Sequence, residues 1–143
     1  MKVMILGGVG TVGGYLAYLI GGWDSAMATL VIFMIIDYLS GLAVAGIFKN
    51  SPKTEHGALN SHIGFKGLVK KAMILMIVLV ANRIDMVLGM TFCRDAAIIA
   101  LITNELISIV ENAGCMGIPV PRPIKRAIEM LYEYNEIKGG EKP

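Results

Sequence analysis

Charged residues are scarce in this chain of 143 residues. Asp, Glu, Lys and Arg make up 17% of it, against about 25% in an average soluble domain. With its 17 glycines included and its 5 tyrosines left out, the apolar share is about 64%, against about 45–50% in soluble domains. A small soluble domain needs many polar residues to cover its large relative surface. The composition therefore argues against a disordered chain or an ordinary soluble enzyme, and favours a small integral membrane protein.

Cysteine and net charge are also low. The two cysteines, Cys93 and Cys115, match no metal-binding or redox spacing. A helix between them would hold them about 33 Å apart, too far for a disulfide within one chain. The net charge of +2 is too small to indicate nucleic-acid binding. We therefore expect no cofactor, no metal site and no nucleic-acid partner.

Apolar runs divide the chain into four segments: 3–22, 25–48, 72–92 and 96–118. A membrane-spanning helix needs about 20 apolar residues, and a spanning segment must satisfy its own backbone hydrogen bonds. The sequence thus predicts an all-α integral membrane protein with about four transmembrane helices. After them, Ile124, Ile128, Leu131 and Tyr134 share one face of a short C-terminal amphipathic helix.

Lysine and arginine are distributed unevenly between the connecting segments. They concentrate in the polar loop 49–71 and in the tail 119–143, whereas the breaks near residues 24 and 94 hold Arg94 alone. Such residues mark the cytoplasmic side of a membrane protein. We expect residues 1–118 to form the transmembrane domain with a cytoplasmic basic loop. The tail and both termini are expected to be cytoplasmic too.

A glycine motif near the N-terminus offers another interpretation. Residues 8–13 read G-x-G-x-x-G, after a strand-like run, as in a dinucleotide-binding turn. However, residues 15–22 lack the polar face of a water-exposed helix, and too little chain remains for a substrate domain. Small residues at such spacing also permit close packing of membrane helices. We therefore identify two pairs as helix-packing candidates: Gly10 with Gly14, and Gly41 with Ala45.

Ionisable residues interrupt the third segment, which contains Asn82, Arg83 and Asp85. A central Arg or Asp costs about 2.5–3.5 kcal/mol on insertion, so this helix needs partners. In an antiparallel hairpin that turns at Arg94, Arg83 and Glu105 lie at the same depth. We hypothesise an intramembrane Arg83–Glu105 ion pair, with Asp37 or Asp85 nearby. The alternative is that these residues face a water-filled cavity.

The fourth segment carries a polar stripe within an arc of about 120°: Asn104, Glu105, Ser108, Glu111 and Asn112. Such a stripe turns toward protein or toward water, so it either packs against other helices or lines an aqueous lesion in an oligomer. The sequence shows no pairing of a nucleophile with a base, and we do not expect an enzyme.

Several stretches together resemble a known family: 22–24, 37–41, 60–71, 81–85, 104–114 and 117–121. The most specific is the run Asn-Glu, Ser-Ile-x-Glu-Asn and Gly-x-Pro-x-Pro, which begins at Asn104. On these residues the chain resembles the toxin-secretion and phage-lysis holin family of Gram-positive phages and clostridial toxin loci. The resemblance extends over roughly residues 4–135.

The resemblance implies a protein that accumulates in the cytoplasmic membrane of the bacterial host and oligomerises there. It then opens lesions through which endolysin, or a toxin, leaves the cytoplasm. The implied partners are the lipid bilayer and further copies of the chain, while endolysin passes without stable binding. Two alternatives remain: an antiholin of the same family, and a small multi-span transporter. The transporter class resembles exchangers with a Glu in the first span, which contains no acidic residue here.

Overall fold

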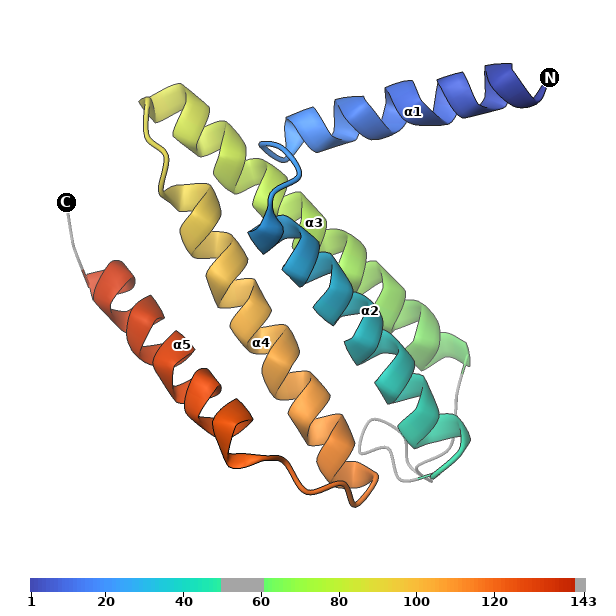
Figure 1. The fold of residues 1–143 in the computed structure, drawn as a ribbon, viewed down its shortest axis with the longest axis vertical. Helices are drawn as coiled ribbons and strands as arrows, with labels where there is room; N and C mark the ends of the chain where they lie inside the picture. The colour runs from blue at the N-terminus through green and yellow to red at the C-terminus, as the bar shows by residue number, and fades with distance from the viewer. Residues whose placement is uncertain (50–60, 141–143) are drawn as a thin grey trace.

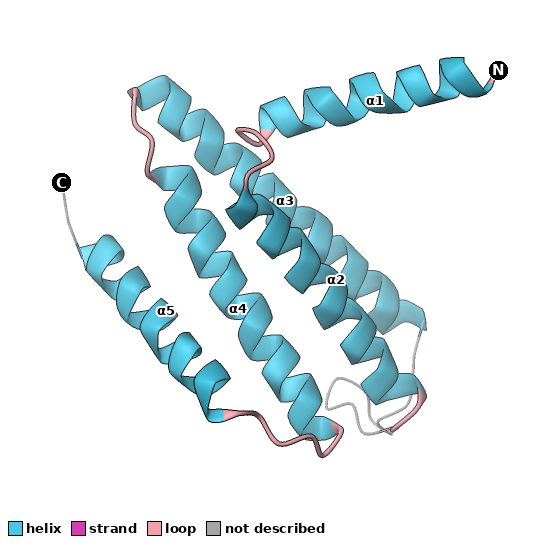
Figure 2. Ribbon diagram, in the orientation of Figure 1, coloured by secondary structure: helices cyan, strands magenta, loops and turns pink. Residues whose placement is uncertain are grey.

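The computed structural model describes residues 1–49 and 61–140, and this part of the chain consists of helices and short connections without strands (Figure 2). The helices are α1 (Lys2–Leu19), α2 (Ser25–Gly46), α3 (Ser61–Leu88), α4 (Cys93–Cys115) and α5 (Arg122–Gly140). The all-helical prediction is confirmed. The middle of the basic loop (50–60) and the end of the tail (141–143), both expected to be cytoplasmic, lie outside the described residues.

Helices α2, α3 and α4 form a bundle (Figure 1). Their apolar side chains recur at helical spacing, so each helix turns one stripe inward. The stripes meet in a single core made of Met27, Leu30, Met34, Ile74, Val78, Ile98 and Ile102. This core is small, because much of the remaining apolar surface of the three helices faces outward.

Helix α1 lies apart from this bundle and points away from it (Figure 1). None of its residues is buried. The G-x-G-x-x-G motif lies within this continuous helix, so the strand and turn of a dinucleotide site are not formed there. A Cβ added at Gly10 or Gly14 would meet nothing within 4 Å. The apolar surface of α1 is therefore left uncovered by the described part of the chain.

Among the residues that the structure describes, three helices are long and apolar enough to cross a membrane: α1, α2 and α4. The predicted count of four spans is not confirmed, and the exception is α3. This helix of 28 residues carries five charged side chains, namely Lys66, Lys70, Lys71, Arg83 and Asp85. Charged residues flank its apolar run at both ends.

Helix α5 follows two prolines, has a third at its second position, and packs along α4 (Figure 1). Ile128 and Leu131 are half-buried there, and the Asn135 amide donates a hydrogen bond of 3.3 Å to the Thr103 hydroxyl. Tyr134, expected on the same face, is 41% exposed. The predicted amphipathic helix is present, with Ile128, Leu131 and Asn135 toward α4.

Arg94 connects α4 to the loop between α1 and α2. Its guanidinium is buried and donates to the carbonyl oxygens of Ile20 (2.6 Å) and Gly22 (3.0 Å) and to the Asp24 carboxylate (2.7 Å). The Asn82 amide of α3 donates to the Leu19 carbonyl oxygen at 2.9 Å. These side chains hold the loop against the ends of α3 and α4.

Asp85 of α3 caps α4. Its two carboxylate oxygens accept hydrogen bonds from the backbone N–H groups of Cys93 (2.9 Å) and Arg94 (2.8 Å). The first N–H groups of a helix have no partner within the helix and favour negative charge. The cap therefore fixes the α3–α4 turn. We call Asn82, Asp85, Arg94 and Asp24 the loop network.

The loop network leaves no room for a side chain at position 21. Gly21 has φ +85°, and a Cβ there would lie 2.5 Å from Asn82 Oδ1 and 2.6 Å from Arg94 Nε. Gly22 has φ +98° but nothing within 4 Å of its Cβ position, so it is a matched control for backbone strain. We expect Gly21→Ala to lower the free energy of unfolding by about 1–3 kcal/mol more than Gly22→Ala. Denaturant unfolding in detergent, followed by circular dichroism, measures this difference. Equal losses would contradict the proposed crowding.

Asp24 makes the loop network sensitive to acid. Its hydrogen bond with Arg94 holds the pKa of the Asp24 carboxyl below its ordinary value of 3.8. A lowered pKa contributes stability above pH 3.8, and that contribution is lost as pH falls through the folded-state pKa. Asp24→Asn keeps the cap of α2 but removes the charge. We expect the variant to unfold at a lower temperature than the wild type near neutral pH, with the gap closing in acid below pH 3.8. Glu133→Gln on the exposed side of α5 serves as the control. A gap independent of pH would contradict the assignment.

Candidate functional site

The middle of the bundle contains charged side chains from three helices. The Lys71 ammonium group of α3 donates to the carboxylates of Asp37 on α2 and Glu105 on α4. One cation thus joins two anions that belong to different helices. We call Asp37, Lys71, Glu105, Asn112 and Ser40 the central charge cluster.

Asn112 completes the cluster from the C-terminal half of α4. Its amide lies 3.2 Å from the Asp37 carboxylate and 2.9 Å from the Ser40 hydroxyl oxygen, both as acceptors. It also lies 3.3 Å from the Asp37 backbone oxygen. Asp37 is therefore bound from α3 and from α4. A Cβ added at Gly41, one turn away, would lie 3.7 Å from this amide, so the small residue accommodates close approach.

Helical periodicity places the cluster in the core stripe. On α2 the buried residues Met27, Leu30 and Met34 recur every three or four positions, and Asp37 continues the series. On α4, Glu105 continues the series that begins with Ile98 and Ile102. Glu105 is 2% exposed and Asp37 is 8% exposed. A carboxylate at this depth is costly unless it is paired and hydrogen-bonded, and Lys71 and Asn112 supply those partners.

The structure separates the residues predicted from the sequence into three groups. Asp37, Glu105 and Asn112 come together in the central charge cluster, with Ser108 half-buried on the same helix. Asn82 and Asp85 belong to the loop network. Arg83, Asn104 and Glu111 are exposed on the outside of the bundle. The stripe on α4 therefore has an inner part that is bound within the bundle and an outer part, Asn104 and Glu111, that is exposed.

The structure gives Glu105 a different partner from the hypothesised one. Lys71 binds Glu105, whereas the Arg83 guanidinium lies 3.5 Å from the Met86 sulfur. The hypothesis placed the turn at Arg94, but α3 ends at Leu88 and α4 begins at Cys93. The middle of the turn is thus earlier in the sequence, which puts Arg83 and Glu105 about 10 Å apart in depth. Arg83 also projects from the outer side of α3.

The sequence interpretation missed Lys71, which it assigned to the basic loop. Residues 60–71 are polar and were therefore predicted to be part of the loop, whereas a helix begins at Ser61. Helical spacing was the available signal, since Lys71, Ile74 and Val78 lie three and four residues apart and the latter two are buried. Within residues 1–49 and 61–140, no three His, Cys, Asp or Glu side chains are grouped so that they could hold a metal ion.

Lys71 can be tested against the adjacent Lys70, which is exposed. Lys71→Met leaves Asp37 and Glu105 without their cation, and removal of one partner from a buried pair costs about 3–5 kcal/mol. We expect a loss of this size for Lys71→Met and almost none for Lys70→Met, measured as unfolding of the purified protein in detergent. The triple variant Lys71→Met, Asp37→Asn, Glu105→Gln should recover part of the loss. A similar stability of the two single variants would show that the cluster does not hold the bundle.

Comparison with known proteins gives consistent results. The sequence profile of the bacteriophage holin family matches residues 14–133. A probable holin of Bacillus phage phi105 is 29% identical over 110 residues, which cover 76% of each chain. The match includes the bundle helices α2, α3 and α4 together with most of α5.

Bacterial relatives are more similar in sequence. An uncharacterized protein of Listeria monocytogenes is 40% identical over 142 residues, covering 99% of this chain and 93% of the relative. An uncharacterized protein of Clostridium perfringens is 35% identical over 133 residues, covering 92% of this chain and 93% of the relative. No solved structure matches the chain. Because the profile match extends over most of the chain, it shows that this chain belongs to the bacteriophage holin family.

Proposed function

We propose that this protein is a holin that oligomerises in the cytoplasmic membrane and forms lesions through which endolysin leaves the cell. The observation that carries this proposal is the inverted polarity of the bundle. Its centre holds Asp37, Lys71 and Glu105, whereas its outer surface is rich in large apolar side chains. A water-soluble bundle has the opposite arrangement. The antiholin and transporter alternatives share the membrane location, and the test below separates them.

The outer surface fits a lipid environment. Exposed apolar residues lie along α2 and α3, and they include Ile32, Ile35, Leu39, Met73, Met76, Val80, Ile84 and Val87. Patches larger than a few hundred Å² are rare on soluble monomers and mark contact with membranes or partners. Helix α1, which is largely apolar and has no buried residue, requires the same surroundings.

We propose that α3 also crosses the membrane, so that the chain has four spans. Three of its polar side chains are directed to protein partners, Lys71 to the central charge cluster and Asn82 and Asp85 to the loop network. Their insertion cost is therefore offset within the bundle. The exposed Arg83 lies one to two turns from the end of α3, where a long side chain reaches the headgroups.

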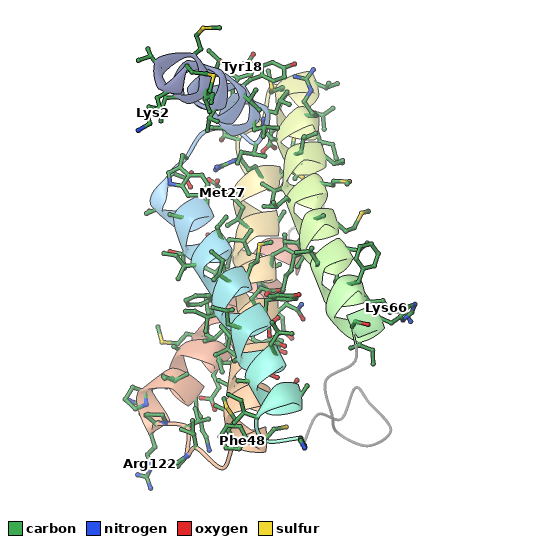
Figure 3. The ribbon with its side chains drawn as sticks, turned by 90° about the vertical axis from the view of Figure 1, so that its right-hand side faces the viewer. Lys2, Tyr18, Met27, Phe48, Lys66 and Arg122 are labelled. Atoms are coloured by element: carbon green, nitrogen blue, oxygen red, sulfur yellow. The ribbon has the colours of Figure 1, made fainter. Side chains whose placement is uncertain are left out.

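The proposed orientation follows from the end of the bundle at which cations gather. Phe48, Lys66 and Arg122 lie at the same end, opposite α1 (Figure 3). Lys49, Lys70, Lys125 and Arg126 are close to them in sequence, so this end is assigned to the cytoplasm. A cytoplasmic N-terminus then requires α1 to turn alongside α2, which the bilayer favours because α1 carries no charged residue after Lys2.

The tail is proposed to remain outside the hydrocarbon region. Helix α5 carries Arg126, Glu129 and Glu133 on its exposed side. Charged side chains at the centre of a bilayer cost roughly 2.5–3.5 kcal/mol each, so α5 cannot stay beside a membrane-inserted α4 with these groups toward lipid. We propose that α5 separates from α4 on insertion and lies in the cytoplasm.

Induction of the gene together with an endolysin that lacks its own export signal tests the function. We expect an abrupt fall in culture density after a delay, and only when both genes are active, because the lesions must pass a folded enzyme. A catalytically inactive endolysin is the control. Absence of lysis, with the protein detected in the membrane fraction, would reject the holin assignment and favour an antiholin or a transporter of small solutes.

A further inference from the structure

One side of α4 carries polar residues that the bundle leaves uncovered. Asn104 and Glu111 are both exposed, and because they lie two helical turns apart they share one side of the helix. Within residues 1–49 and 61–140, neither side chain takes part in a hydrogen bond or ion pair. A polar stripe on a membrane helix turns toward protein or water rather than lipid. This side of α4 therefore requires a polar partner outside its own bundle.

The ends of the two helices at the α3–α4 turn fix the depth of Glu111 relative to a lysine on α3. Lys70 lies 18 residues before the end of α3 at Leu88, and Glu111 lies 18 residues after the start of α4 at Cys93. In an antiparallel pair of helices, residues equally far from the turn lie at about the same level. Consecutive helix residues point about 100° apart, so Lys70 and Glu111 project outward, and both are exposed.

Lys70 and Glu111 do not pair within one chain. No ion pair joins them in the described part of the structure. Lys66, one turn before Lys70 on α3, points away from the bundle (Figure 3). Each copy thus presents an exposed cation on α3 and an exposed anion on α4, at about one depth.

We propose that a second copy of this chain docks here, with the α4 side of Asn104 and Glu111 packed against the α3 side of Lys66 and Lys70. The contact is centred on an intermolecular Glu111–Lys70 ion pair. This interface rests on the proposed function, which requires copies to assemble in the membrane, and it specifies the surfaces they use. Because the two surfaces differ, the contact is head-to-tail and repeats from copy to copy, as in a ring or an open row.

Parallel insertion selects Lys70 over Arg83, an exposed cation farther along α3. Copies inserted with the same orientation can pair only groups that lie at equal depth. Arg83 lies 13 residues after Lys70 on the same helix, about 20 Å farther along the axis. Glu111 of one copy therefore cannot reach Arg83 of the next, whereas Lys70 is level with it.

Charge reversal tests the interface, with Glu111→Lys and Lys70→Glu made in separate chains. Each variant alone opposes like charges in every contact, whereas a mixture of the two restores opposite charges in contacts between them. We expect each single variant to associate at least about tenfold more weakly than the wild type. The equimolar mixture, and the double variant in one chain, should recover most of the association. Energy transfer between labelled copies in phospholipid vesicles measures it.

Arg83→Glu and Glu133→Lys are matched controls, since they reverse exposed charges elsewhere and should leave association unchanged. Recovery in the mixture also shows that both variants are folded. The interface is wrong if either single variant associates like the wild type, or if the mixture fails to recover. Lysis with endolysin is recorded in parallel. If the wild type and Glu111→Lys lyse cells equally well, the interface is rejected and the proposed function stands. If the wild type associates but never releases endolysin, the proposed function is rejected and the interface stands.

Discussion

The ionic contact of Lys71 with Asp37 and Glu105 is the constraint on which the rest of the bundle depends. Between helices in lipid the hydrophobic effect supplies little attraction, because lipid tails are as apolar as leucine. The small core of α2–α4 therefore does not by itself determine how the helices are aligned along their axes. Two buried carboxylates and one ammonium group determine this alignment, because sliding or rotating any helix would leave a charge unpaired at low dielectric.

The loop network and the central charge cluster act at different levels of the same bundle. Asp85 caps α4 and Arg94 binds the loop that follows α1, which fixes how the chain enters and turns. Asp37, Lys71 and Glu105 then fix the middle. Both sets include side chains of α3, whose charges make membrane insertion of the isolated helix unfavourable. On the proposal that α3 crosses the membrane, its polar residues find their partners only when α2 and α4 are in place, so assembly of the bundle and insertion of α3 are coupled.

Much of the fold follows from the sequence, because the length of an apolar run is a local property of the chain. The ends of the helices were harder to place. Lys66, Lys70 and Lys71 gave the start of α3 the composition of a loop, and only the burial of Ile74 and Val78 shows that the stripe extends back to Lys71. The partner of Glu105 depended on the exact turn, where a shift of a few residues changes depth by several ångströms. No local sequence pattern predicts that α1 lies apart from the bundle, since an apolar helix can pack equally well against protein and against lipid.

The division of α4 into an inner and an outer polar side bears on how a folded bundle can also assemble. Glu105 and Asn112 are engaged within the chain, while Asn104 and Glu111 point to another side of the same helix. In the proposed interface, therefore, association uses groups that the internal cluster does not need. Copies can then gather without breaking the contact of Lys71 with its two carboxylates. Under these proposals the internal charges preserve the subunit while the external ones set the depth at which neighbours meet, and the proposed lesion grows by addition of intact bundles.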